Sequence, residues 1–73
     1  MNKLVTLKKG EKGKIAYLEL LGRVKQKFSA MGLTSGAVVT MKGIAPLGDP
    51  LLFEARDVLF ALRKSEADKI YLM

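Results

Sequence analysis

The segment APLGDP, residues 45–50, constrains the fold of this chain most, because it holds the only two prolines among the 73 residues. Proline cannot donate a backbone hydrogen bond, and it forces the preceding residue into an extended conformation. Between the prolines, Gly48 supplies conformational freedom, and Asp49 can accept hydrogen bonds from nearby backbone amides. Because proline is excluded from central strands, the segment predicts a stiff, extended arch between two strands.

Alternating apolar residues on both sides of the arch predict strands. The predicted strands span residues 14–20, 37–42, 51–55 and 58–62, and Ile70 and Leu72 form a closing strand. In the first strand, Ile15 and Tyr17 are expected on one face. The third and fourth strands are separated by Arg56 and Asp57 alone, which predicts a two-residue hairpin turn.

Two short helical segments are predicted beside these strands. Val24, Phe28 and Met31 recur with helical spacing and form one apolar stripe that is expected to dock on the sheet. Gly32 follows at once and suits the left-handed conformation that ends a helix. Ser65, which precedes two acidic residues within three positions, is expected to cap a single C-terminal helical turn. A mostly β domain follows, a small antiparallel barrel or open roll of about five strands.

Length and composition place the chain as one small domain spanning residues 1–73, because a chain of this size has apolar surface for a single core. There is no cysteine, so neither disulfides nor thiolate metal sites can stabilise it. The N-terminal residues lack the apolar stretch of a secretory signal, and no segment has the length of a membrane span. We expect a cytoplasmic protein.

The net charge of +6 is concentrated in residues 1–27, which carry eight basic side chains and only two acidic ones. The remainder of the chain is balanced. Such asymmetry is typical of a surface that binds nucleic acid or an acidic partner. A solvated lysine-rich surface that keeps the protein soluble is the alternative.

The order of several short motifs resembles the FeoA family of ferrous iron transport proteins. The motifs are MGL (residues 31–33), Gly36, the arch, FALR (residues 60–63) and SEA (residues 65–67). The resemblance implies an SH3-like β-barrel with one short inserted helix, which assists the membrane ferrous iron permease FeoB and is not an enzyme. The family pattern falls on Met31, Gly32, Leu33, Gly36, Ala45, Pro46, Leu47, Gly48, Asp49, Pro50, Leu62, Arg63 and Ala67. Asp57 departs from the glycine that the family often has in the hairpin.

The chain offers little chemistry for a reaction or a metal. It has no histidine, so its three serines lack the usual base, and Fe²⁺ would lack its usual imidazole ligand. The acids Glu66 and Asp68 lie two positions apart, and Glu54 and Asp57 flank a turn, so neither pair is expected to converge. We therefore expect no catalytic residues, no metal site and no cofactor, with Fe²⁺ handled by the transport system.

Partner contact is the function that remains. The predicted contact residues lie just before and within the first helix, and they are Leu20, Leu21, Arg23, Lys25 and Lys27. Whether both leucines are exposed for docking or instead complete the core stays open. An RNA-binding SH3-like module or a metal-responsive regulatory domain is the alternative, although only Tyr17 and Tyr71 lie outside core positions as stacking residues. We expect no nucleic acid partner, membrane contact only through FeoB, and weak self-association at free strand edges.

Overall fold

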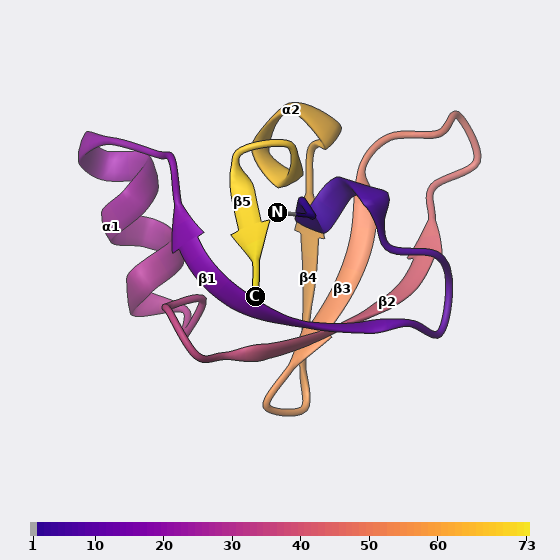
Figure 1. Cartoon of the computed structure of the whole chain (residues 1–73). Helices are drawn as coiled ribbons and strands as arrows, with labels where there is room; N and C mark the ends of the chain where they lie inside the picture. Colours follow the sequence, from indigo (N-terminus) through magenta and orange to yellow (C-terminus); the bar gives the residue numbers. More distant parts are fainter. Residues whose placement is uncertain (1) are drawn as a thin grey trace.

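The structure is a computed structural model that describes residues 2–73, and its elements are five strands, two α-helices and one 3-10 helix (Figure 1). In chain order they are η1 (Leu4–Thr6), β1 (Lys12–Leu18), α1 (Gly22–Ala30), β2 (Val38–Ile44), β3 (Leu51–Ala55), β4 (Val58–Leu62), α2 (Lys64–Ala67) and β5 (Ile70–Leu72). The predicted mostly β class, the inserted helix and the C-terminal helical turn are confirmed.

All strands pair antiparallel in one sheet with the order β4-β3-β2-β1-β5. The N-terminal segment runs along β5, where Lys3 bridges to Tyr71 and the Leu72 amide donates to the Asn2 carbonyl at 2.7 Å. The N-terminus thus covers one edge of the curved sheet, which leaves β4 as the edge at the other side.

The core lies inside the curve of the sheet and is wholly apolar among the described residues. In β3 every second residue is buried, as the alternation predicts, because successive side chains of a strand point to opposite faces. The core residues are Leu4, Ile15, Leu20, Phe28, Leu33, Ala37, Val39, Met41, Leu51, Phe53, Ala55, Phe60, Leu62, Ala67, Ile70 and Leu72.

A β-bulge in β1 overturns one prediction. Ile15 is fully buried, but the register against β5 shifts between Ile15 and Tyr17, and the Tyr17 side chain is 46% exposed. A bulge inserts an extra residue and so reverses the face on which later residues lie. The expectation that Ile15 and Tyr17 share a face is therefore wrong, and Tyr17 points outward.

The hairpin between β3 and β4 confirms the predicted two-residue turn. Arg56 and Asp57 have φ values of 52° and 63°, and Ala55 pairs with Val58 across the turn. Two consecutive residues with positive φ define a type I′ turn, whose twist matches that of the flanking strands. Asp57 thus takes the conformation for which glycine is favoured, so its departure from the family pattern leaves the turn type intact.

The arch of residues 45–50 joins β2 to β3 and is closed by its own backbone hydrogen bonds, as predicted for a stiff connection. The Gly48 amide donates to the Ala45 carbonyl at 2.8 Å, and the Ala45 amide donates to the Pro50 carbonyl at 3.0 Å. The Asp49–Pro50 bond is cis, and Gly48 has a φ of 89°. Asp49 accepts a hydrogen bond from the Lys64 amide at 2.9 Å, which fastens the arch to α2.

The start of α2 differs from the prediction that Ser65 caps it. The helix begins at Lys64 with Arg63 as the N-cap residue, so Ser65 already lies inside the first turn. Two carboxylates take the free amides instead. Glu66 accepts from the Arg63 amide at 2.9 Å, and Asp49 accepts from the Lys64 amide. The cap therefore comes partly from a residue 15 positions away, which no local pattern could indicate.

Candidate functional site

Helix α1 stands beside β1 at one side of the sheet (Figure 1). It ends in a Schellman motif, in which the Gly32 amide donates to the Ser29 carbonyl at 3.0 Å and the Leu33 amide donates to the Phe28 carbonyl at 2.9 Å. Gly32 has the positive φ of 91° that this ending requires, as predicted. Leu33 and Phe28 are both buried, so the end of the helix is fixed to the core.

Phe28 is the one α1 residue that is buried, with 2% of its surface exposed. Val24 and Met31 belong to the same predicted stripe, but both are exposed large apolar residues. The prediction that all three dock on the sheet is therefore wrong, because α1 flanks the sheet instead of lying across it (Figure 1). Most of the helix surface consequently faces solvent.

The structure separates the two leucines that precede α1. Leu20 is 7% exposed and belongs to the core, whereas Leu21 is 88% exposed. The interpretation of Leu20 as an exposed docking residue is thus wrong, because its side chain belongs to the core. Arg23, Lys25 and Lys27 are all exposed, so the predicted surface retains Leu21 and these three cations.

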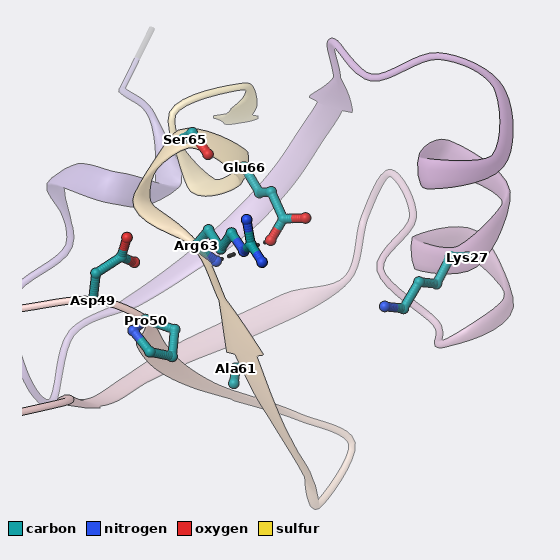
Figure 2. Close-up of a pocket in the computed structure, with 7 residues that line it drawn as sticks. All are labelled: Lys27, Asp49, Pro50, Ala61, Arg63, Ser65 and Glu66. Atoms are coloured by element: carbon teal, nitrogen blue, oxygen red, sulfur yellow. Dashed lines mark hydrogen bonds between the residues drawn. The ribbon is translucent and has the colours of Figure 1, made fainter.

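Lys25 and Lys27 border two different hollows, because residues two positions apart on a helix point to different sides. Lys27 lines a polar cleft of about 640 Å³ together with Asp49, Pro50, Ala61, Arg63, Ser65 and Glu66 (Figure 2). Lys25 lines a smaller hollow of about 250 Å³, which we name the helix–strand pocket, together with Tyr17, Leu18, Ser29, Thr34 and Ser35.

In the polar cleft the acidic side chains accept hydrogen bonds, whereas the basic side chains have no ion-pair partner in the described chain. Asp49 and Glu66 accept hydrogen bonds from backbone amides at the start of α2. Among residues 2–73, the ion pairs within 4 Å join Lys3 to Asp68 and Lys42 to Glu54, so neither Lys27 nor Arg63 has an ion-pair partner in the described chain. Figure 2 shows the Lys27 side chain reaching from α1 toward the side of the cleft formed by β4 and Arg63.

The helix–strand pocket has a rigid aromatic wall. The rings of Tyr17 and Tyr71 stack with centroids 4.6 Å apart and an interplanar angle of 11°, and Lys3 Nζ lies 5.6 Å from the Tyr71 centroid. The pKa of Tyr71 is raised above its ordinary value, mainly because of hydrogen bonding to the Glu19 carboxylate. The β1 bulge turns the Tyr17 ring outward, and stacking on Tyr71 holds the ring there.

Between residues 2 and 73, no group of three or more acidic side chains is arranged to hold a metal ion. None of the helices there has the length and apolar character needed to cross a membrane.

Comparison with known proteins decides the family. The sequence model of the FeoA domain matches residues 2–73. The chain belongs to the FeoA domain family. No curated protein matches it by sequence. Among solved structures, the FeoA protein of Chlorobium tepidum is 30% identical with a TM-score of 0.92, and the match covers 97% of this chain and 68% of that one.

Two further structures extend the comparison of this FeoA chain. Iron(II) transport protein A of Clostridium thermocellum is 35% identical with a TM-score of 0.90, over 97% of this chain and 44% of that one. The zinc complex of FeoA from Stenotrophomonas maltophilia is 25% identical with a TM-score of 0.83, over 100% of this chain and 91% of that one. That protein is described as a prokaryotic SH3 domain, which confirms the predicted SH3-like fold.

A manganese-dependent transcriptional repressor shares the fold alone. It is 12% identical with a TM-score of 0.85, over 99% of this chain and 40% of that one. The FeoA-like fold therefore also occurs as part of a longer chain.

The FeoA motif residues divide into two groups in the structure. Leu33 is buried, and Gly32, Gly36 and Gly48 have positive φ values, so these positions serve the fold. Arg63 differs, because its side chain is exposed and lines the polar cleft, while only its backbone contributes to the start of α2. Its side chain is thus available for contact with a partner.

The helix–strand pocket is the feature that sequence reasoning missed. One signal was present, because Tyr17 and Tyr71 were the aromatic residues left outside core positions. Their stacking, however, depends on the pairing of β1 with β5, two segments more than fifty residues apart. The bulge that turns Tyr17 outward could not be predicted, because residues 15–18 form a continuous apolar run in which no alternation assigns the two faces.

Proposed function

We propose that this protein is a non-enzymatic accessory of bacterial ferrous iron uptake and acts by contact with a FeoB-type membrane permease. Membership in the FeoA family supports a role in ferrous iron transport. The Stenotrophomonas maltophilia relative is described as a candidate activating factor of ferrous iron transport. In this proposal the protein works in the cytoplasm, reaches the membrane only through the permease, and has no cofactor or resident metal.

The single observation that carries the proposal is the exposed surface of α1. This short helix is held through Phe28, while Leu21 just before it is 88% exposed. Arg23, Lys25 and Lys27 project from the same helix. An exposed apolar side chain at the start of a helix that carries three cations suits an acidic protein surface, because complementary charge speeds encounter and apolar contact retains the complex.

RNA binding is the second candidate, and the exposed tyrosine stack is the observation in its favour. Single-strand binders combine basic grooves with aromatic rings on which bases stack. Here, however, the rings of Tyr17 and Tyr71 cover each other at 4.6 Å. That arrangement occupies one face of each ring and reduces the surface on which a base could stack.

The experiment that tests the proposal is binding of the purified protein to membranes that contain the FeoB-type permease. We expect binding that weakens as salt is raised, and at least a tenfold loss in a variant with Lys25→Glu and Lys27→Glu. The matched control carries Lys12→Glu and Lys14→Glu, two exposed lysines of β1 with the same spacing. Circular dichroism should show that both variants fold.

Two results would reject this contact surface. One is permease binding that neither salt nor the α1 variant weakens, and the other is an equal loss in the β1 control. Binding to labelled single-stranded RNA that is tighter than binding to the permease would favour the second candidate.

A further inference from the structure

The size of the helix–strand pocket restricts what it can hold. Its volume is about 250 Å³, and it lies between α1, β1 and the residues that follow the helix. An apolar cavity of about 150 Å³ accommodates benzene. Pockets for whole small molecules begin at roughly 300 Å³. The helix–strand pocket therefore matches one large side chain.

The walls of the pocket favour an aromatic side chain. Tyr17 presents a ring that is held by stacking on Tyr71, and half-buried Leu18 adds an aliphatic surface. Aromatic rings pack well against such a wall in an offset or edge-to-face geometry. Ser29, Thr34 and Ser35 complete the lining with hydroxyl groups, which can accept a hydrogen bond from an indole or phenol.

The charge around the pocket favours acidic neighbours of that side chain. Its lining includes one cation, Lys25, and no carboxylate, while the Glu19 carboxylate is held by Tyr71, which does not line the pocket. Residues 1–27, which include β1 and most of α1, carry the whole net charge of +6. A segment with acidic residues beside its aromatic one would therefore be attracted, and a basic segment would be repelled.

We propose that the helix–strand pocket is an anchor site for one aromatic side chain in an acidic segment of a partner protein. Aromatic anchors seated in small desolvated pockets supply most of the binding energy in many interfaces. This inference deepens the proposed function and rests on it only for the identity of the partner. The pocket and its preference are properties of this chain alone, and they can be measured without the permease.

The absence of tryptophan from the chain makes a direct test simple, since the fluorescence of a tryptophan-containing peptide then has no protein background of its own kind. The probe is a capped pentapeptide with tryptophan at its centre and two acidic residues on each side. We expect a saturable change in its emission. The same peptide with lysines as flanking residues should bind at least tenfold more weakly, and an acidic peptide with central serine should not compete at tenfold excess.

Variants of the pocket locate the site. Ser29→Leu fills the pocket from α1 and should weaken binding at least tenfold, while Gln26→Leu, which places the same side chain at an exposed α1 position outside the lining, should change it less than threefold. Lys25→Glu should weaken binding of the acidic probe and reduce its salt dependence, whereas Lys12→Glu, the same change on β1, should not. Amide NMR spectra of each variant establish that it is folded.

Several outcomes would overturn the anchor site. The first is that the acidic tryptophan peptide does not bind at millimolar concentration. The second is that the Ser29→Leu variant binds it as tightly as the unchanged protein does, or that the serine peptide competes as well as the tryptophan peptide. The third is that a second copy of the chain occupies the pocket, which would be seen as concentration-dependent shifts of the pocket amides without peptide. If the peptide does not bind but the α1-dependent permease contact persists, only the anchor site is rejected. If the peptide binds but permease contact is absent, only the proposed function is rejected.

Discussion

Gly48 shows how much a single residue contributes to the arch. Its φ of 89° lies in a region that side chains disfavour, and its amide donates to the Ala45 carbonyl. Space is not the constraint, because an added Cβ would come no closer than 3.6 Å to the end of the flexible Lys64 side chain. The requirement for glycine is therefore conformational.

Replacing Gly48→Ala should lower the free energy of unfolding by about 1 kcal/mol, since the native conformation becomes strained. Gly43→Ala is the control, because Gly43 lies in β2 without positive φ and its added Cβ would lie 4.0 Å from the nearest atom. Urea denaturation measures both. An unchanged midpoint for Gly48→Ala would mean that the arch does not hold this conformation in solution.

Helix α1 shows how much of an element's structure can be predicted from its own residues. Its end at Gly32 was predictable, because the left-handed residue after a helix has a local steric cause. Its orientation was not, since helical spacing places Val24, Phe28 and Met31 on one stripe but does not say how much of that stripe another element covers. In the structure the sheet covers Phe28 alone of these three.

Phe28→Ala should therefore cost about 3 kcal/mol or more, while Val24→Ala on the same stripe should cost less than about 0.5 kcal/mol. Hydrogen exchange adds a local measurement to the denaturation curves. In Phe28→Ala the amides of α1 should lose protection before those of β3, because the helix loses its attachment to the core. Equal costs for the two variants would show that the whole stripe is buried in solution.

At the scale of the whole molecule, the two chain ends close the domain together. Leu4 in η1 is fully buried, and the Leu72 amide donates to the Asn2 carbonyl. The Met73 amide also donates to the Lys14 carbonyl in β1 at 2.8 Å. Terminal residues usually tolerate change, but here they fill the core and cover the edge of β5.

Leu4→Ala should accordingly lower the free energy of unfolding by about 3 kcal/mol, despite its place near the N-terminus. Leu21→Ala is the matched control, with the same chemical change at an exposed leucine, and it should cost less than about 0.5 kcal/mol. Thermal unfolding followed by circular dichroism compares the two. Similar melting temperatures would contradict the closure of the core by η1.

Features that depend on neighbouring residues could be predicted from the sequence alone. The alternation in β3, the Arg56–Asp57 turn, the proline-bounded arch and the glycine that ends α1 each follow from the sterics of a few consecutive residues. These features also sufficed to indicate a small antiparallel barrel or open roll, whereas the SH3-like class came from the resemblance to the FeoA family. The basic N-terminal third could likewise be read directly, because net charge is a property of composition.

The surfaces that those elements present are set by tertiary packing. The bulge that exposes Tyr17, the burial of Leu20 beside exposed Leu21, and the capping of α2 by Asp49 all depend on segments distant in the chain. The same is true of the helix–strand pocket, whose lining comes from β1, α1 and the residues that follow α1. A side chain's face and partners are set by what packs against it, and that information is spread over the whole sequence.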